Sequence, residues 1–449
     1  MLWAHHNPVG GGGLGVSQIG DHTANSMETI NIPYGTSFLP WQISTRRHVQ
    51  VIESPNPEPI DPAKAIWDVL WHPTDHTTPL ADRIRPCNQV AIVISDITRG
   101  WIPTSTILEQ ILKVLNWRGI KDHQITVIVA IGSHRPLTQS EIRNLVSPEL
   151  ARRLKVINHD CQNPEDLVAV GDSTRGTPIA LNRHYIQADC RILTGGITYH
   201  FMSGFSGGRK SILPGIAAYE TIQANHCMLL DAGASYGSGI LDSNPLHHDM
   251  MEIAALAEPT FLVNAIPGAR GDTVAIVGGD WDSAWQIGTK LVAKQYGATL
   301  ETTADLVIVS TGGYPLDINL YQSIKALING AEAVKPDGGL ILVAQCMDGT
   351  GASEFSLWLD YPDLETMETG LRTGFTVPGF IAYTMRQIAG HYPTALVSDL
   401  PSELALKTGM VPHTSIQAAI DWLDNTLPRK GSVHILPQGN LTLPILAGG

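Results

Sequence analysis

The chain has 449 residues, more than one ordinary hydrophobic core holds, so two domains of about 150 to 250 residues each are expected. An apolar content of 43% fits packed globular domains, and no apolar run approaches the roughly 18 residues that a membrane-spanning helix needs. The formal net charge of -13 disfavours nucleic acid and anionic membranes as partners, since either would need a basic patch.

The N-terminal segment contains a glycine cluster at residues 10–13 but no continuous apolar stretch typical of a secretion signal. We therefore expect residues 1–26 to be a disordered extension, with an arm between two copies in a homodimer as the alternative. The five cysteines are odd in number, sparse and without a CxxC pair. This usage favours a reducing, cytoplasmic location without disulfides.

Short runs rich in Val and Ile alternate with helical patterns along the chain. The predicted strands are residues 89–95, 125–131, 190–196, 305–311 and 338–344. This alternation predicts an α/β fold, with largely parallel sheets in two α/β domains. A helical segment ends near Tyr296 and a new series begins by Thr303, so we expect the domains to be residues 27–298 and 299–449.

Polar loops follow these predicted strands. Their sequences are SDITR at 95–99, GSHRP at 132–136, TYHFMSGFSGGRK at 198–210 and GGYPLDINLYQSIK at 312–325. In parallel sheets, binding groups gather on the loops beyond the carboxyl ends of the strands. We therefore expect an active-site cleft between the two domains.

The densest of these signals is the glycine-rich loop that runs from Gly204 to Lys210. Its glycines would let backbone N–H groups approach an anion, so a phosphate is the expected ligand. The alternative is a tight turn beside a surface lysine. The spacing is not that of a Walker loop. Lys210 fits either a point charge on a phosphate or a nucleophilic amine that holds a cofactor covalently.

Histidines accompany this loop: His134 closes the GSHRP segment, and His200 and His226 flank Lys210 in the sequence. Each can serve as a general acid or base, as a neutral metal ligand, or simply as a packed or solvated side chain. Because no HExxH or paired Cys/His pattern is present, a protein-only zinc site is disfavoured. Any metal should be carried largely by a cofactor.

Two cations are candidates for holding a substrate carboxylate, Arg99 and Lys325. Arg99 could instead belong to an internal salt-bridge loop with Asp96. Lys325 shares one side of a short predicted helix with Tyr321 and Gln322, and an exposed helix face is the ordinary explanation of such a set.

The motifs SDxTR, GxHRP, HxxxGFSGGxK and YQxxK occur here in one order that resembles the lactate racemase family, whose members carry a nickel pincer nucleotide. The resemblance runs from residue 30 to near Ser398. It implies a cytoplasmic isomerase that racemises a short, lactate-like 2-hydroxy acid by proton-coupled hydride transfer through a 2-oxo acid. Malate, an aromatic hydroxy acid or a sugar acid is the alternative substrate.

The resemblance also implies residue roles. Lys210 would form the covalent link to the nickel pincer nucleotide, and His226 would be the protein ligand to nickel. His134 and His200 would be the acid/base pair, with Arg99 and Lys325 binding the substrate. The residues that would line the cofactor or substrate pocket are Asp96, Ser203, Tyr321 and Gln322. Cofactor-maturation enzymes are implied as partners.

The chain departs from the family pattern at Gly100, where many relatives have proline, and at Arg209, where relatives often have a small residue. Two competing interpretations remain. A nicotinamide oxidoreductase would need a GxGxxG turn after a strand, which is missing. A carrier of the nickel cofactor would need Lys210 and His226 but not the pair His134 and His200.

Overall fold

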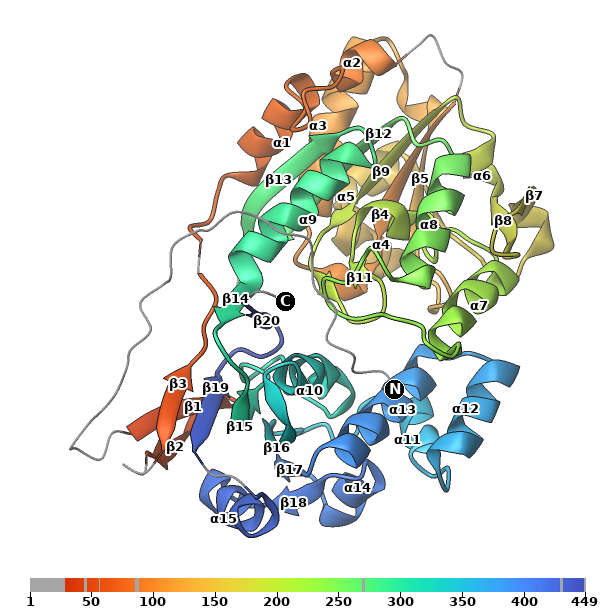
Figure 1. Ribbon diagram of the computed structural model, residues 1–449. Coiled ribbons are helices and arrows are strands. Elements are labelled where there is room, and N and C mark those ends of the chain that lie inside the picture. The colour runs from red at the N-terminus through yellow and green to blue at the C-terminus, as the bar shows by residue number, and fades with distance from the viewer. Residues whose placement is uncertain are drawn as a thin grey trace. The chain divides into compact units, whose positions relative to one another are not determined.

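The chain forms two compact α/β units (Figure 1). The computed structural model describes residues 29–43, 47–55, 57–84, 89–268, 271–428 and 431–447, so the expected extension at 1–26 lies outside the described residues. We call Asn56–Gln295 the central unit. The terminal unit joins the described residues up to Pro55 to those from Tyr296 onward. The predicted α/β class with two largely parallel sheets is confirmed.

The central unit is built on a six-stranded sheet. Its strands are β4 (Val90–Ser95), β5 (Ile125–Ala130), β6 (Lys155–Asn158), β9 (Cys190–Gly196), β12 (Phe261–Pro267) and β13 (Thr273–Gly279). Their order is β13-β12-β9-β4-β5-β6, and only the β12 to β13 pairing is antiparallel. The predicted strands in this part of the chain are confirmed as β4, β5 and β9.

Helices and two antiparallel ribbons complete the central unit. The helices are α1 (Pro62–Trp71), α2 (Leu80–Arg83), α3 (Thr104–Trp117), α4 (Gln139–Val146), α5 (Pro148–Arg153), α6 (Arg183–Ile186), α7 (Tyr219–Cys227), α8 (Pro245–Leu256) and α9 (Ser283–Tyr296). The ribbons are β7 (Leu167–Asp172) with β8 (Pro178–Asn182), and β10 (Tyr199–His200) with β11 (Gly204–Phe205).

Strand β4 shows why this sheet is buried on both faces. Every residue from Val90 to Ile94 is apolar and almost fully buried, as expected of a parallel strand covered by helices on each side. Helix α3 adds Ile107, Ile111 and Leu115 to the same core at helical spacing. The strand ends are therefore rigid platforms for the polar loops that follow them.

The terminal unit is built on a second six-stranded sheet, in which all strands are parallel. Its strands are β3 (His48–Val51), β15 (Ala304–Ser310), β16 (Val334–Val343), β17 (Thr394–Val397), β18 (Val411–His413) and β19 (Ser432–Leu436), in the order β18-β17-β16-β15-β19-β3. The other strands are β1 (Thr29–Tyr34), paired with β2 (Ser37–Gln42), and β14 (Gly297–Leu300), paired with β20 (Leu443–Leu446). Strands β15 and β16 confirm the remaining predicted strands.

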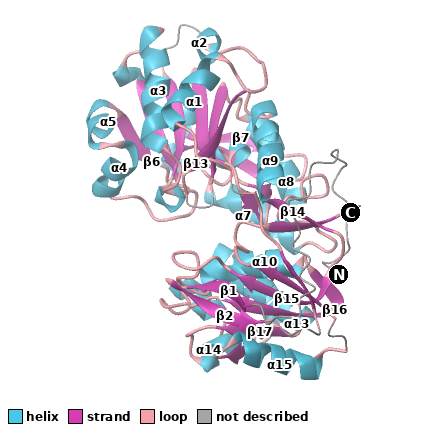
Figure 2. Ribbon diagram, turned by 90° about the vertical axis from the view of Figure 1, so that its left-hand side faces the viewer, coloured by secondary structure: helices cyan, strands magenta, loops and turns pink. Residues whose placement is uncertain are grey.

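Helices cover both faces of this second sheet. They are α10 (Ile324–Ala331), α11 (Ser353–Trp358), α12 (Leu364–Thr373), α13 (Val377–His391), α14 (Ser402–Lys407) and α15 (Ile416–Thr426). Helix α10 packs on β15 and β16, and α15 packs on β16 and β17 from the opposite face (Figure 2).

The limits of the two compact units differ from those of the domains expected from the sequence. Strand β3 pairs with β19, from His48 opposite Ser432 to Val51 opposite Ile435. Residues 48–51 therefore belong with the C-terminal part of the chain, although they precede the central unit. Local sequence patterns do not reveal a pairing between strands so far apart along the chain.

Two absences bear on the sequence-based expectations. Across the described ranges, no helix combines the length and the apolar character needed to cross a bilayer. No disulfide joins the cysteines that the structure describes, Cys161, Cys190, Cys227 and Cys346, and Cys87 lies outside the described residues.

Candidate active site

Two predicted site residues meet where the neighbouring strands β4 and β5 end. Ser95 and Ala130 are partners at the last register position of these strands. Asp96 follows the first, and His134 lies on the loop after the second, with its Nδ1 2.8 Å from Asp96 Oδ2. Because the carboxylate accepts, Nδ1 carries the proton, and Nε2 of the neutral ring is the nitrogen left to act as a base.

The Asp96 carboxylate is held in its charged form. Burial by itself would raise its pKa, but hydrogen bonds from His134 and Thr98 and the charge of Arg99 together lower the pKa below the ordinary value. The side chain of His134 is 58% exposed, whereas that of Asp96 is 7% exposed. An accessible imidazole is thus oriented by a buried carboxylate.

Arg99 lies in a short 3-10 turn, Ile97–Arg99, that Asp96 caps through the backbone N–H of Thr98. Its Nη1 donates to Thr98 Oγ1 at 3.3 Å. Asp96 Oδ2 faces His134, and the charge of Arg99 also acts on this carboxylate. Arg99 is half-buried and lies beside the Asp96–His134 pair.

His200 and Lys210 form the second pair of predicted residues. The backbone N–H groups of Met202 and Ser203 lie 3.2 and 3.3 Å from His200 Nδ1, which therefore accepts. The proton of the neutral ring must then be on Nε2, which lies 2.8 Å from Lys210 Nζ. The Lys210 amine, which is a nucleophile in its uncharged form, therefore faces the His200 ring.

Two glycines of the loop are required by packing. Gly207 and Gly208 have φ of 70° and 53°, and a Cβ at Gly208 would lie 2.5 Å from Trp285 Cδ1. The N–H of Gly208 donates to Asn264 Oδ1 at 2.9 Å, and the N–H of Lys210 donates to Gly207 O at 3.1 Å. These two N–H groups bind acceptors within the protein.

Ser203, which directly precedes this loop, is fully buried. Its hydroxyl donates to Phe205 O at 3.1 Å, and its carbonyl oxygen accepts from Arg209 Nη2 at 2.6 Å. Ser203 thus takes part in holding the loop. The buried side chains of Arg209, His247 and Trp285 also hold the loop. No role for them was predicted from the sequence, because His247 and Trp285 lie outside every motif and Arg209 occupies a variable position of its motif.

His226 lies on α7 with 4% of its surface exposed. Its Nδ1 donates to Ile222 O at 2.9 Å, so Nε2 of the neutral ring carries the lone pair that a metal ligand needs. Burial lowers the pKa of His226 to about 4, so the ring is neutral at pH 7. In the described part of the chain, no group of three or more His, Cys, Asp or Glu residues could hold a metal ion. A single imidazole ligand suits a metal that another group carries.

The remaining predicted residues belong to the terminal unit. Tyr321 and Gln322 lie in a 3-10 turn, Tyr321–Ser323, that leads into α10, and Lys325 is near the start of that helix. The Tyr321 ring packs edge-on against Phe355, with centroids 5.7 Å apart. Gln322 and Lys325 are exposed and three residues apart, as the exposed-face interpretation expects.

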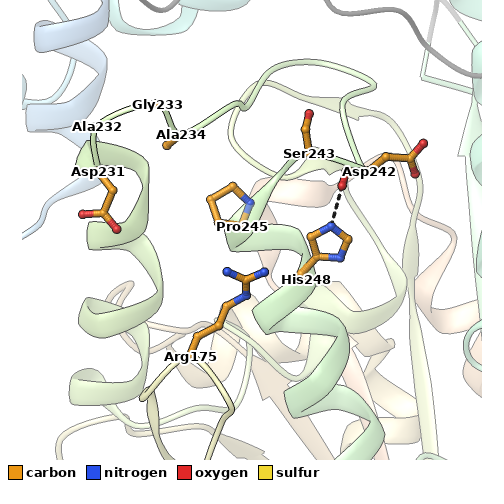
Figure 3. Close-up of a pocket in the computed structure, with 9 residues that line it drawn as sticks. All are labelled: Arg175, Asp231, Ala232, Gly233, Ala234, Asp242, Ser243, Pro245 and His248. Carbon is orange, nitrogen blue, oxygen red and sulfur yellow. Dashed lines mark hydrogen bonds between the residues drawn. The ribbon is translucent and has the colours of Figure 1, made fainter.

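A pocket of about 390 Å³ opens elsewhere on the central unit (Figure 3). Its lining residues are Arg175, Asp231, Ala232, Gly233, Ala234, Asp242, Ser243, Pro245 and His248. His248 Nε2 donates to the carbonyl oxygen of Asp242 at 2.8 Å. None of the predicted site residues in the described chain lines this pocket.

Comparison with known proteins extends these observations to most of the chain. Residues 34–237 match the model of the lactate racemase N-terminal domain, and residues 299–441 match that of the lactate racemase C-terminal domain. Lactate racemase from Thermoanaerobacterium thermosaccharolyticum is 29% identical over 425 residues, covering 92% of this chain and 98% of the relative. Lactate racemase from Lactiplantibacillus plantarum is 32% identical over 371 residues, covering 80% of this chain and 86% of the relative.

Solved structures agree. The lactate racemase apoprotein from T. thermosaccharolyticum superimposes with a TM-score of 0.83 and 28% identity, over 93% of this chain and 100% of that chain. A Thermotoga maritima protein shares the fold, with a TM-score of 0.61, 17% identity, and coverage of 87% of this chain and 100% of that chain.

Two α/β units and a pair of oriented histidines, taken with these relatives, define an isomerase of the racemase class. The chain belongs to the lactate racemase family. The oxidoreductase and cofactor-carrier interpretations are accordingly set aside.

Proposed function

We propose that this chain racemises a short 2-hydroxy acid such as lactate with a nickel pincer nucleotide attached at Lys210. The observation that carries the proposal is the pair of histidines, His134 and His200. Each has its Nδ1 fixed by a neighbouring group, Asp96 in one case and the Ser203 backbone N–H in the other. A racemase works in both directions, so it needs one acid/base group for each enantiomer.

The chemistry of the other donors fits the proposed cofactor. Lys210 supplies a primary amine, the group that covalent attachment through nitrogen requires, and its Nζ lies 2.8 Å from His200 Nε2. His226 offers one neutral imidazole nitrogen to a metal. Lys210 and His226 would therefore hold the nickel pincer nucleotide, which supplies a hydride acceptor for the hydrogen on the substrate Cα, with a 2-oxo acid between the two enantiomers.

The residues of the chain would handle the proton and the carboxylate. His134 Nε2 would take the hydroxyl proton of one enantiomer, and His200, whose proton is on Nε2, would return a proton to the substrate oxygen when the other enantiomer forms. Arg99 would hold the substrate carboxylate in forked geometry, and Lys325 would add a compact charge, so that the planar 2-oxo acid stays bound while it reorients. Asp96 would keep His134 in its basic tautomer.

Ser203, Tyr321 and Gln322 complete the proposed pocket. Support for Ser203 comes from its place between His200 and the glycine-rich loop. Tyr321 and Gln322 lie one turn before Lys325, so the three would act together from the terminal unit. A larger 2-hydroxy acid, such as malate, an aromatic hydroxy acid or a sugar acid, is the second candidate substrate for the same groups.

We further propose a cytoplasmic setting in which other enzymes make and deliver the cofactor, because the sparse cysteines fit a reducing compartment. The protein should therefore be produced together with cofactor-making enzymes before it is assayed. Intact mass and nickel content then test attachment. A mass increment on the peptide containing Lys210, with about one nickel per chain, is expected. An unmodified Lys210 alongside a loaded control racemase would contradict the proposal.

Replacement of one histidine tests the catalytic roles. His134→Ala should lower kcat for conversion of D- to L-lactate by about 10² to 10⁴ while the cofactor stays bound, because one general acid/base is lost. His123→Ala is the matched control, since His123 is an exposed histidine of the same unit. Chiral chromatography of both directions provides the measurement. Loss of the cofactor from His134→Ala would count against the acid/base role.

A further inference from the structure

Arg209 is a charged side chain with 0% of its surface exposed. Its Nη1 donates to Phe205 O at 3.0 Å and its Nη2 to Ser203 O at 2.6 Å. Its Nε donates to His247 Nδ1 at 3.2 Å. The guanidinium carbon lies 4.0 Å from the centroid of the Trp285 ring, in cation–π geometry. All three nitrogens thus bind groups of the protein, and Arg209 is not aimed at a ligand.

A buried guanidinium is costly unless its hydrogen bonds are fully met, and an apolar side chain would fill the same volume at lower cost. None of the contacts just described is with a carboxylate. Burial lowers the pKa of Arg209 to about 9, and burial together with the charge of Arg209 lowers the pKa of His247 to about 2. His247 therefore stays a neutral acceptor, and the guanidinium stays charged at pH 7.

The carbonyl groups of the loop are the main acceptors in this cluster. Besides the two that Arg209 binds, the carbonyl oxygen of Ser206 accepts from Trp285 Nε1 at 2.9 Å. The peptide N–H of Ser203 donates to His200 Nδ1, and Lys210 directly follows Arg209 in the chain. Fixing these carbonyl groups therefore fixes the donors that orient His200, and also the start of the turn that carries Lys210.

We infer that Arg209 is a positioning residue, whose guanidinium holds the 203–206 backbone so that His200 keeps its tautomer and faces Lys210. The inference rests on the proposed function for the roles of His200 and Lys210, but the arrangement itself exists in the protein before any cofactor is bound. Trp285 assists through the Ser206 carbonyl, and His247 assists as the neutral acceptor.

The test compares Arg209→Lys with Arg191→Lys. Lysine keeps the charge but lacks the planar fork that reaches two carbonyl groups at once. Arg191 is a matched control in β9, because it too donates through three nitrogens, here to three backbone carbonyl oxygens at 2.8 to 3.1 Å, and lies over an aromatic ring, that of Tyr185. Both variants should lower the melting temperature of the protein. Only Arg209→Lys should alter the tautomer of His200 and the reactivity of Lys210.

Two readouts in the cofactor-free protein separate positioning from mere stability. The ¹⁵N chemical shifts of His200 report its tautomer, and peptide mass spectrometry reports the rate at which an amine-directed acylating reagent modifies Lys210. Arg209→Lys should give mixed tautomers and about tenfold slower acylation, the rate equivalent of one hydrogen bond, whereas Arg191→Lys should match the wild type. In the loaded enzyme, kcat should fall with little change in KM.

Trp285→Phe is a second variant, for use if Arg209→Lys does not fold. It keeps an aromatic ring but removes the N–H that binds Ser206 O. The change in the His200 tautomer and the slowing of Lys210 acylation should therefore both be present but smaller. If the His200 chemical shifts and the Lys210 acylation rate are unchanged in the folded variants, the inference is overturned, regardless of the racemase activity of those variants. The two proposals can also fail separately. If the wild-type protein has no racemase activity but Arg209→Lys still changes the His200 shifts and the Lys210 acylation rate, the proposed function is contradicted and the positioning role of Arg209 is supported.

Discussion

The two oxygen atoms of Asp96 have different partners. Oδ1 accepts from the N–H and the hydroxyl of Thr98 and so closes the turn after β4, whereas Oδ2 faces His134. The sequence places Asp96 and His134 on polar loops after predicted strands. It does not show that these loops meet, because that contact depends on β4 and β5 being neighbours in the sheet.

Asp96→Asn should lower kcat by up to about a hundredfold, because an amide no longer selects the tautomer of His134 and the imidazole loses its alignment. Turnover in both directions should be measured together with the circular dichroism spectrum of the variant. Asp172→Asn, at an exposed carboxylate of the same unit, serves as the control. Wild-type turnover in Asp96→Asn would show that His134 needs no orienting carboxylate.

At the scale of elements, the glycine-rich loop is shaped by what packs against it. Gly208 has positive φ and lies against Trp285, which is buried and hydrogen-bonded to Ser206 O. Gly176 also has positive φ, 83°, but a Cβ there would meet nothing within 4 Å. A comparison of the two glycines therefore distinguishes the cost of backbone strain, present at both, from the cost of steric overlap, present only at Gly208.

Gly208→Ala should therefore destabilise the protein by about 2 to 4 kcal/mol, since strain at positive φ adds to a clash that Trp285 cannot relieve. Gly176→Ala should cost only about 1 kcal/mol, from the strain alone. Urea unfolding followed by tryptophan fluorescence would give both values. Equal losses in the two variants would mean that Trp285 moves aside.

Asp305 connects three strands of the terminal unit. Its Oδ1 lies 2.8 Å from Lys335 Nζ on β16, and its Oδ2 accepts from the backbone N–H groups of Gly431 and Ser432 beside β19. Burial alone would raise its pKa, but these bonds lower it to about 2 from the ordinary 3.8. A depressed carboxyl pKa stabilises the fold above pH 3.8, and this stabilisation is lost as the pH falls toward 2.

Asp305→Asn should thus lower the free energy of unfolding by about 1 to 3 kcal/mol at pH 7, and the difference from the wild type should shrink between pH 4 and pH 2. Thermal unfolding at several pH values would measure it. Asp337→Asn, at an exposed position of the same strand as Lys335, should show no such trend. A difference that stays constant with pH would rule out the charge as its source.

Several elements were predictable because their signals are local. The runs that became β4, β5, β9, β15 and β16 are rich in Val, Ile and Leu, and the helical patterns between them imply parallel pairing. The Arg209 cluster was not predictable, since arginine is ordinarily a surface residue and its partner Trp285 comes much later in the chain. Strand β3 was not predicted either, because its partner strand β19 lies far away in the sequence.

At the scale of the whole molecule, β3 ties the two ends of the chain into one sheet. Val49 is 4% exposed, lies opposite Val433 and belongs to the core of the terminal unit. Val49→Ala should destabilise that unit by about 2 kcal/mol through the cavity it leaves. Hydrogen exchange should show faster amide exchange in β19 and β15 but not in β4, whereas Val168→Ala in the half-exposed β7 should leave the terminal unit unchanged.

The pairing of β3 with β19 also sets an order of events during synthesis. All six strands of the central sheet lie within Asn56–Gln295, so this unit has everything it needs once that stretch has left the ribosome. In the terminal sheet, β3 stays unpaired until Ser432–Leu436 is made. Contacts so distant in sequence form slowly. The growing chain should therefore carry a folded central unit, including Lys210, His134 and His200, while β3 still lacks its partner strand.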